Sequence, residues 1–162
     1  MTTPIPLTAP TTAPTRYAGS FTVDSWEQVD DEPQDGFSTS PVTLTKTFAG
    51  DLTGTSRARI VIAATDSGSR AYAGFEQVTG TVAGRTGSFV LRHMAEGDAG
   101  GGWMTWNVVR GSGTGDLAGV RGEGQITRHD DGSHTYWLEL AFAEDLAGAV
   151  TEDLAGAASE AP

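Results

Sequence analysis

Cysteine is absent from this chain of 162 residues. Its absence excludes a disulfide framework, a thiolate nucleophile and a zinc site built on thiolates. Basic residues are scarce as well: 10 lysines and arginines stand against 21 aspartates and glutamates, giving a formal net charge of −11 at pH 7. Because proteins that bind nucleic acids need clustered lysine and arginine to contact phosphates, no nucleic-acid partner is expected.

Long apolar runs are missing too. No stretch approaches the ~20 residues that a membrane-spanning helix needs, so a membrane partner is not expected either. The N-terminus has neither the basic region nor the apolar segment of a secretory signal. These two absences together predict a cytoplasmic protein.

Both ends of the chain differ in composition from its middle. Residues 1–15 are rich in threonine and carry prolines at positions 4, 6, 10 and 14, so a disordered tail is expected there. Residues 144–162 form an acidic tail rich in alanine and glycine, in which the phrase Glu-Asp-Leu-Ala-Gly-Ala occurs twice. Disorder is favoured over a frayed helix in this segment. One domain is therefore predicted over residues 16–143.

The most informative segment is 109–126, where glycine occupies positions 111, 113, 115, 119, 122 and 124. Glycine repeated inside strands marks tight curvature, a bulge, or the close approach of another backbone or a ligand. A phosphate-binding loop is the competing interpretation, but no Gly-Lys-Ser/Thr and no helix-forming run follow. The glycines therefore favour a small, strongly coiled β-barrel.

A related phrase, glycine-x-apolar-x-glycine, occurs three times, within residues 48–56, 78–89 and 115–119. Each copy is predicted to be a strand corner, with its apolar residue pointing inward and a glycine absorbing the bend. Such repetition favours a closed sheet whose strands tilt and coil together.

Between residues 16 and 143 the apolar residues recur with a period of two, and no internal helix is convincing. The pattern predicts eight strands, over residues 17–27, 42–47, 57–65, 70–82, 86–94, 103–110, 116–128 and 133–143. We therefore predict an all-β fold, an eight-stranded antiparallel barrel whose interior holds side chains or one small ligand. The segments 28–41 and 95–102 are candidate lids over the barrel mouth.

Alternation along the strands assigns side chains to the two faces of the barrel. The inner face is predicted to hold six polar or aromatic side chains, namely Tyr72, Glu76, His93, Trp106, His134 and Tyr136. The aromatic residues Phe75, Trp103 and Trp137 fall on the outer face. Exposed aromatics on a barrel wall favour a subunit interface, so a homo-oligomer is expected.

Several motifs resemble the signature of a bacterial domain family of unknown function. They are residues 47–56, 71–80, 84–93 and 111–122, together with His134-x-Tyr136. The resemblance covers roughly residues 17–143. It implies a fold like that of allene oxide cyclase and dirigent proteins, an eight-stranded barrel with a central cavity. That wider group of barrels includes cofactor-free cyclases and isomerases acting on small molecules, which is an analogy at the level of fold.

The inner-face residues support a hypothesis of acid/base catalysis without cofactor or metal. A carboxylate on an apolar face loses solvation, so the pKa of Glu76 is expected to be raised into the range useful for a general acid or base. His93 and His134 are assigned to share its proton, and Tyr72 and Tyr136 to donate to a developing oxyanion. The expected substrate-binding wall consists of Trp106, Phe89, Met104, Leu91 and Leu138. The predicted reaction is a cyclisation, isomerisation or elimination on an apolar small molecule.

Simpler interpretations stay open for the same residues. Glu76 can be paired with Arg92 or Arg110, or hydrogen-bonded by strand-end amides. His93 can be a hydrogen-bonded core residue, and His134 can fix the neighbouring turn. Glu76, His93 and His134 together would suit iron or zinc, but no short ligand spacing supports a metal site. At the level of function, the alternatives are a non-catalytic carrier of a small molecule and a structural or oligomeric barrel.

Overall fold

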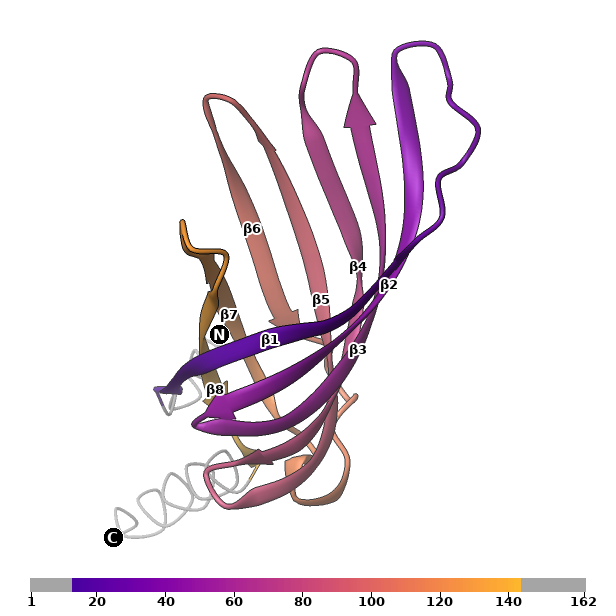
Figure 1. Ribbon diagram of the computed structural model, residues 1–162. Coiled ribbons are helices and arrows are strands. Elements are labelled where there is room, and N and C mark those ends of the chain that lie inside the picture. Colours follow the sequence, from indigo (N-terminus) through magenta and orange to yellow (C-terminus); the bar gives the residue numbers. More distant parts are fainter. Residues whose placement is uncertain (1–12, 144–162) are drawn as a thin grey trace, which may run out of the picture.

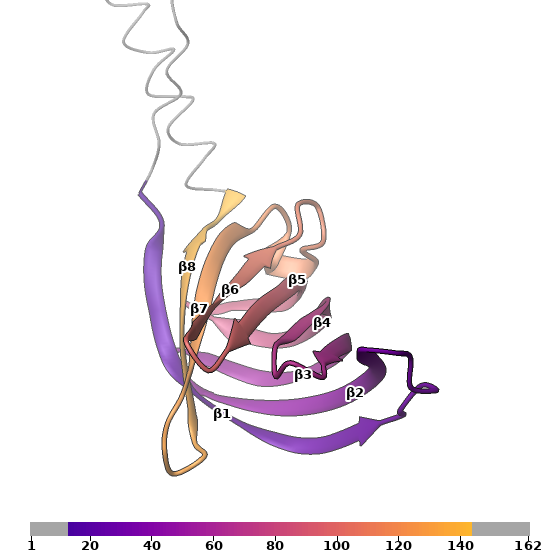
Figure 2. The same cartoon turned by 90° about the horizontal axis from the view of Figure 1, so that it is seen from above.

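The computed structural model describes residues 13–143, which form a closed barrel of eight antiparallel strands (Figure 1). Neighbours in sequence are neighbours in the sheet, and the first strand pairs with the last. Seen from above, the strands follow one another around the ring (Figure 2). The strands are β1 (Thr15–Gln28), β2 (Phe37–Gly50), β3 (Leu52–Thr65), β4 (Arg70–Val82), β5 (Arg85–Asp98), β6 (Gly101–Val108), β7 (Arg121–Arg128) and β8 (His134–Ala141). The predicted all-β, eight-stranded antiparallel barrel is confirmed.

Most of the two tails assigned from composition, residues 1–12 and 144–162, lies outside the described residues. In the described part, β1 already begins at Thr15, the last residue of the expected N-terminal tail. No helix within residues 13–143 is long and apolar enough to cross a membrane.

Part of the first expected lid and most of the second are strand. Residues 37–41 belong to β2, which pairs with β3 from Phe37 onward. Strands β5 and β6 continue their ladder as far as Asp98 and Gly101, so only two residues separate them. The expected loop at 28–41 is confirmed for residues 29–36 and was wrong for residues 28 and 37–41. At 95–102 the expectation was wrong for every residue but 99 and 100. Acidic and glycine-rich composition suggested loops there, whereas continuous backbone pairing with a neighbouring strand decides the structure.

The three glycine-x-apolar-x-glycine phrases do lie at strand corners. Their apolar residues Leu52, Val82 and Leu117 are buried almost completely, as predicted. The third phrase forms a short 3-10 turn, η1 (Gly115–Leu117), so β7 begins only at Arg121 rather than at residue 116. Leu117 on this turn belongs to the cluster of buried side chains that fills one end of the barrel.

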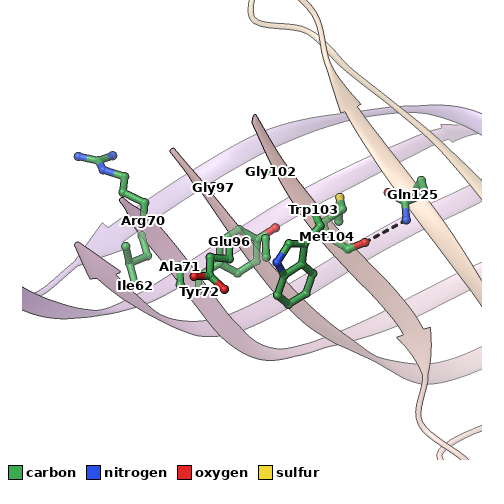
Figure 3. Close-up of a pocket in the computed structure, with 11 residues that line it drawn as sticks. Ile62, Arg70, Ala71, Tyr72, Glu96, Gly97, Gly102, Trp103, Met104 and Gln125 are labelled. Atoms are coloured by element: carbon green, nitrogen blue, oxygen red, sulfur yellow. Dashed lines mark hydrogen bonds between the residues drawn. The ribbon is translucent and has the colours of Figure 1, made fainter. Parts of the chain in front are cut away.

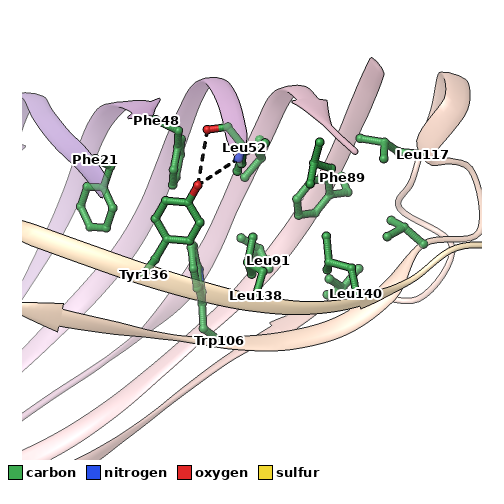
Figure 4. Packing of buried hydrophobic residues seen from close by; sticks show 14 of the residues in the cluster. Phe21, Phe48, Leu52, Phe89, Leu91, Trp106, Leu117, Tyr136, Leu138 and Leu140 are labelled. Atoms are coloured by element: carbon green, nitrogen blue, oxygen red, sulfur yellow. Dashed lines mark hydrogen bonds between the residues drawn. The ribbon is translucent and has the colours of Figure 1, made fainter. Parts of the chain in front are cut away.

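The barrel is packed at one end and open at the other. Beyond their pairing at Trp106 with Gly124 and Asn107 with Glu123, strands β6 and β7 separate. The side chain of Gln125 reaches the Met104 carbonyl oxygen, 3.1 Å away, across this separation (Figure 3). At the closed end, aromatic and aliphatic side chains fill the interior (Figure 4). A second, smaller apolar cluster on β2 and β3 lines the side of the mouth.

A bulge in β1 changes which side chains face the interior. Val23 pairs with Lys46 and Ser25 pairs with Thr45, so Asp24 is the extra residue. Because one extra residue reverses the alternation, Trp26 comes to lie opposite Leu44, on the inner side. Elsewhere the predicted alternation holds, since Glu76, His93, Trp106 and Tyr136 are all buried.

Gly124 in β7 is required by close packing against the barrel interior. A Cβ atom at this position would lie 2.4 Å from the Trp137 carbonyl oxygen and 3.0 Å from the Trp106 ring. We expect Gly124→Ala to lower the free energy of unfolding by about 1–3 kcal/mol, because the backbone of β8 or the indole must shift. Urea denaturation measures the change. Gly100→Ala, in the open β5–β6 turn, is the control and should change stability by less than about 0.5 kcal/mol.

Candidate functional site

A buried carboxylate, Glu76 on β4, is the centre of a polar cluster inside the barrel. Its Oε2 atom accepts hydrogen bonds from Lys46 Nζ at 3.0 Å, His93 Nε2 at 2.5 Å and Trp106 Nε1 at 3.3 Å. Its Oε1 atom accepts a hydrogen bond from the Ser56 hydroxyl. The four donors come from β2, β5, β6 and β3, so the cluster ties five strands together around one side chain.

Lys46 and Ser56 are the two members of the cluster that sequence reasoning missed. Lys46 follows Val42 and Leu44 on the inner face of β2, so alternation within the predicted strand 42–47 was the signal that pointed to it. Ser56 fell outside the predicted strand 57–65, although β3 in fact begins at Leu52. The Lys46 ammonium also lies 4.5 Å from the centre of the Phe21 ring, within range of a cation–π interaction.

Glu76 is ionised, contrary to the expectation from its burial. Burial raises the pKa of this carboxyl, but the hydrogen bond from His93 and the charge of Lys46 outweigh it and lower the pKa to about 2. The alternative of an ion pair holds in kind but not in partner, because Arg92 and Arg110 are both exposed and Lys46 pairs with Glu76. A general-base role for Glu76 therefore loses its physical basis.

His93 is a neutral imidazole at neutral pH. Burial lowers the pKa of this ring, against the opposing effect of Glu76, and the nearby charge of Lys46 lowers it further. A charged His93 would help to lower the Glu76 pKa, but Lys46 already supplies the cation that balances this carboxylate, so burial decides the state of the ring. Because an ionised carboxylate only accepts hydrogen bonds, Nε2 carries the proton and donates a hydrogen bond to Glu76.

The second ring nitrogen of His93, Nδ1, opens into a cavity. Nδ1 has no hydrogen-bond partner among the described residues. Every fully buried side-chain nitrogen or oxygen in residues 13–143 has a partner, so Nδ1 is not fully buried. His93 lines a cavity of about 170 Å³ in the barrel mouth. An unprotonated imidazole nitrogen therefore faces the space that a ligand can enter.

The cavity has a polar floor and apolar walls. Lys46 and His93 form the floor, whereas Glu76 beneath them has no exposed surface. The remaining lining is mostly apolar and consists of Phe21, Val23, Trp26, Leu44, Ala58, Ile60, Ile62, Tyr72, Ile126 and His134. Trp26 is 51% exposed although it lies on the inner side, so its ring presents an uncovered wall to the mouth. Tyr72 and Ile62 also line an outer groove of about 780 Å³, which extends the mouth between β3 and β7 (Figure 3).

The predicted site residues separate into two groups. His93, Tyr72 and His134 line the cavity, and Met104 lines the adjoining groove. The His134 ring stacks on Phe21, with centroids 4.9 Å apart, and burial lowers its pKa. Trp106 is fully buried and contacts the site through its hydrogen bond to Glu76.

The other predicted residues belong to the packed end. Phe89, Leu91 and Leu138 are buried in the core and line none of the pockets described above. The Tyr136 hydroxyl accepts a hydrogen bond from the Leu52 backbone amide at 3.1 Å, so it fixes a strand corner (Figure 4).

The alternative of a metal at Glu76, His93 and His134 finds no support. Residues 13–143 contain no group of three histidine, aspartate or glutamate side chains placed to hold a metal ion. Glu76 is instead occupied by Lys46, His93, Ser56 and Trp106.

Replacement of Glu76 tests its role as the anion of the cluster. Glu76→Gln leaves the buried Lys46 ammonium without a counter-charge, so we expect the free energy of unfolding at pH 7 to fall by about 3–5 kcal/mol. Adding Lys46→Met to the same chain should recover much of the loss. The control is Glu139→Gln, which breaks the exposed pair with Arg16 and should change stability by less than about 1 kcal/mol. An equal effect at both glutamates would contradict the assignment.

The pH dependence of stability should carry the signature of Glu76. Its folded-state pKa, about 2, lies below the ordinary value of 4.5, so its contribution is present above pH 4.5 and is lost as the pH falls toward 2. We expect the difference in unfolding free energy between wild type and Glu76→Gln to shrink by roughly 3 kcal/mol from pH 7 to pH 2. Urea denaturation at several pH values measures it, and a constant difference would refute the low pKa.

Comparison with known proteins places this barrel in a family. The profile of the family described as "Protein of unknown function (DUF3224)" matches residues 17–140. A crystal structure of a protein of unknown function from the DUF3224 family of Shewanella oneidensis MR-1 is similar, with 31% sequence identity and a TM-score of 0.69. That similarity covers 80% of this chain and 97% of the other. No curated protein matches the chain. The matched residues contain every strand that contributes to the Glu76 cluster, and the chain belongs to the DUF3224 family.

Proposed function

We propose that this protein binds a small, largely apolar molecule in the barrel mouth and acts on it as a cofactor-free enzyme. One observation carries the proposal: His93 has one ring nitrogen fixed by an ionised carboxylate and the other open to an apolar cavity. A base held in this way is the arrangement that proton-transfer enzymes use to abstract a proton from a bound substrate.

In this proposal, His93 replaces Glu76 as the proton acceptor. Nδ1 of His93 takes a proton from an acidic C–H group of the bound molecule. Glu76 positions the ring by accepting the Nε2–H hydrogen bond, and its negative charge stabilises the imidazolium that forms. Glu76 itself is out of reach of a ligand, because it has no exposed surface.

The negative charge left on the substrate needs a donor, and two candidates line the same cavity. The Lys46 ammonium has one hydrogen-bond partner, Glu76, among the described residues, so it retains N–H donors for a developing oxyanion. The Tyr72 hydroxyl also belongs to the cavity lining. If the imidazolium returns its proton to another carbon, the result is an isomerisation. Loss of a leaving group in place of that return gives an elimination, and attack of the carbanion within the same molecule gives a cyclisation.

The cavity suggests the size and character of the substrate. A volume of about 170 Å³ suits a small compact molecule, and the adjoining groove gives room for an extension. Trp26, Ile60 and Ile62 supply apolar contact area. The likeness to allene oxide cyclase and dirigent barrels belongs to the same proposal, since those barrels likewise hold reactive apolar molecules in a central cavity.

A generic carbon acid tests the proposal without knowledge of the natural substrate. 5-Nitrobenzisoxazole loses its C3 proton to a base while its N–O bond breaks, which yields a coloured cyanophenolate and needs no cofactor. We expect wild-type protein to accelerate this reaction with saturation. The His93 pKa lies below 6.5, so the rate should be constant through neutral pH and fall only in acid, as the imidazole takes up a proton. His93→Gln keeps a donor to Glu76 but has no base, and should reduce the rate at least about 100-fold.

The matched control is His129→Gln, because His129 is exposed on the β7–β8 turn and lies outside the cavity. It should leave the rate unchanged. Binding is followed separately by quenching of tryptophan fluorescence by the same probe, and circular dichroism confirms that each variant is folded. Binding without acceleration would identify a carrier. Equal acceleration by wild type and His93→Gln would also overturn the assignment of His93 as the base.

A further inference from the structure

The outer face of the barrel carries an apolar patch, and of its members only Trp103 also lines the groove beside the mouth. The patch consists of five side chains on β3 to β6, which we call the outer patch: Val61, Ala73, Phe75, Met94 and Trp103. Four of them are large: the exposed fraction is 48% for Val61, 56% for Phe75, 40% for Met94 and 50% for Trp103. A shallow groove of about 320 Å³ runs along most of these residues. Contiguous exposed apolar surface of this kind marks an interaction site.

Strand register arranges the outer patch and its borders in three rows. The middle row is Val61, Ala73, Met94 and Thr105. The row on one side of it is Arg59, Phe75, Arg92 and Asn107. The row on the other side is Ala63, Ala71, Glu96 and Trp103. The two arginines therefore lie on one side of the middle row and Glu96 on the other, and Phe75 and Ala71 of β4 also lie on opposite sides of it.

We propose that the outer patch binds a second copy of this chain, with a two-fold axis parallel to the middle row. Such an axis stacks the two sheets face to face with antiparallel strands and exchanges the two flanking rows. Met94 then faces Met94 of the other copy on the axis. Phe75 covers the small side chain of Ala71 in the other copy, and Arg92 meets its Glu96.

The charges on β5 are the observation that selects a second copy as the occupant. Arg92 and Glu96 are exposed, and neither forms an ion pair or side-chain hydrogen bond within residues 13–143. They stand on opposite sides of an apolar row on the same strand. A two-fold interface brings the same surface of both copies together, so one Arg92–Glu96 contact implies a second, and both charges are compensated at once.

The size of the surface is adequate for a dimer. A half-exposed aromatic side chain leaves on the order of 100 Å² uncovered, so the outer patch offers roughly 400 Å² of apolar surface. A standard interface buries about 800 Å² on each partner, of which somewhat more than half is apolar. The flanking arginines, Glu96, Thr105 and Asn107 supply the polar remainder.

Charge exchange tests both the dimer and its orientation. We expect the full chain to be a dimer at micromolar concentration in sedimentation velocity at physiological salt. Arg92→Glu and Glu96→Arg each place like charges together across the interface, so each should raise the dimer Kd about tenfold or more. The double variant restores opposite charges and should return the Kd to within about threefold of wild type.

Arg59→Glu is the matched control, since it makes the same change of charge on the same face. In the proposed orientation Arg59 faces Ala63 of the other copy, and its reversal should leave the Kd nearly unchanged. A monomeric wild type up to high micromolar concentration overturns the proposal and leaves the outer patch to a different partner. Single reversals without effect, or a double variant no better than the single ones, overturn it as well. The readout is the oligomeric state, so its result is separate from any catalytic activity. Glu96 also lines the groove beside the mouth, whereas Arg92 and Arg59 line neither this groove nor the cavity.

Discussion

The ionised carboxylate of Glu76 is the constraint on which the rest of the interior depends. A carboxylate without contact to water is costly by several kcal/mol unless charge and hydrogen bonds replace the lost hydration. Here that compensation needs Lys46, Ser56, His93 and Trp106 at once, and each comes from a different strand. Strand register is therefore fixed by the polar cluster as much as by apolar packing. A slip of one residue in any of these strands would turn a donor to the outside and leave the charge uncompensated.

The same cluster lies between the two ends of the barrel, one of which is packed and the other open. On one side of it lie Phe89, Leu117, Leu140 and their neighbours, packed without exposed surface. On the other side, strands β6 and β7 part and the mouth exposes a half-covered tryptophan. Exposed apolar surface on an inner wall lowers stability relative to a filled interior. Its presence beside an available imidazole nitrogen is what favours a ligand over a purely structural role for the mouth.

Much of the fold and part of the site follow from sequence alone, because both depend on strand period and on glycine. Alternation placed Glu76, His93 and Trp106 inside, and the glycine phrases located the buried corners Leu52 and Val82. The pKa of Glu76 could not be predicted in this way. The lowering of this pKa depends on the hydrogen bond from His93 and on the charge of Lys46, which lies 30 residues away in sequence and is brought near Glu76 by the pairing of β2, β3 and β4. Trp26 was missed for a local reason, since the bulge at Asp24 reverses alternation without a clear mark in the sequence.

The polar cluster and the outer patch lie on opposite faces of the same strands. Successive side chains of a strand point to opposite sides. In β4, Glu76 therefore points inward and its neighbour Phe75 outward, and in β5, His93 points inward and its neighbour Arg92 outward. The positions of the two surfaces are thus not independent, since any displacement of β4 or β5 moves both. The polar cluster holds these strands from inside by hydrogen bonds to one carboxylate. A second copy on the outer patch would hold them from outside, at rows adjacent to those that carry Glu76 and His93. Residues with no contact to a ligand, such as Phe75 and Met94, can therefore influence how rigidly the imidazole of His93 is presented to the mouth.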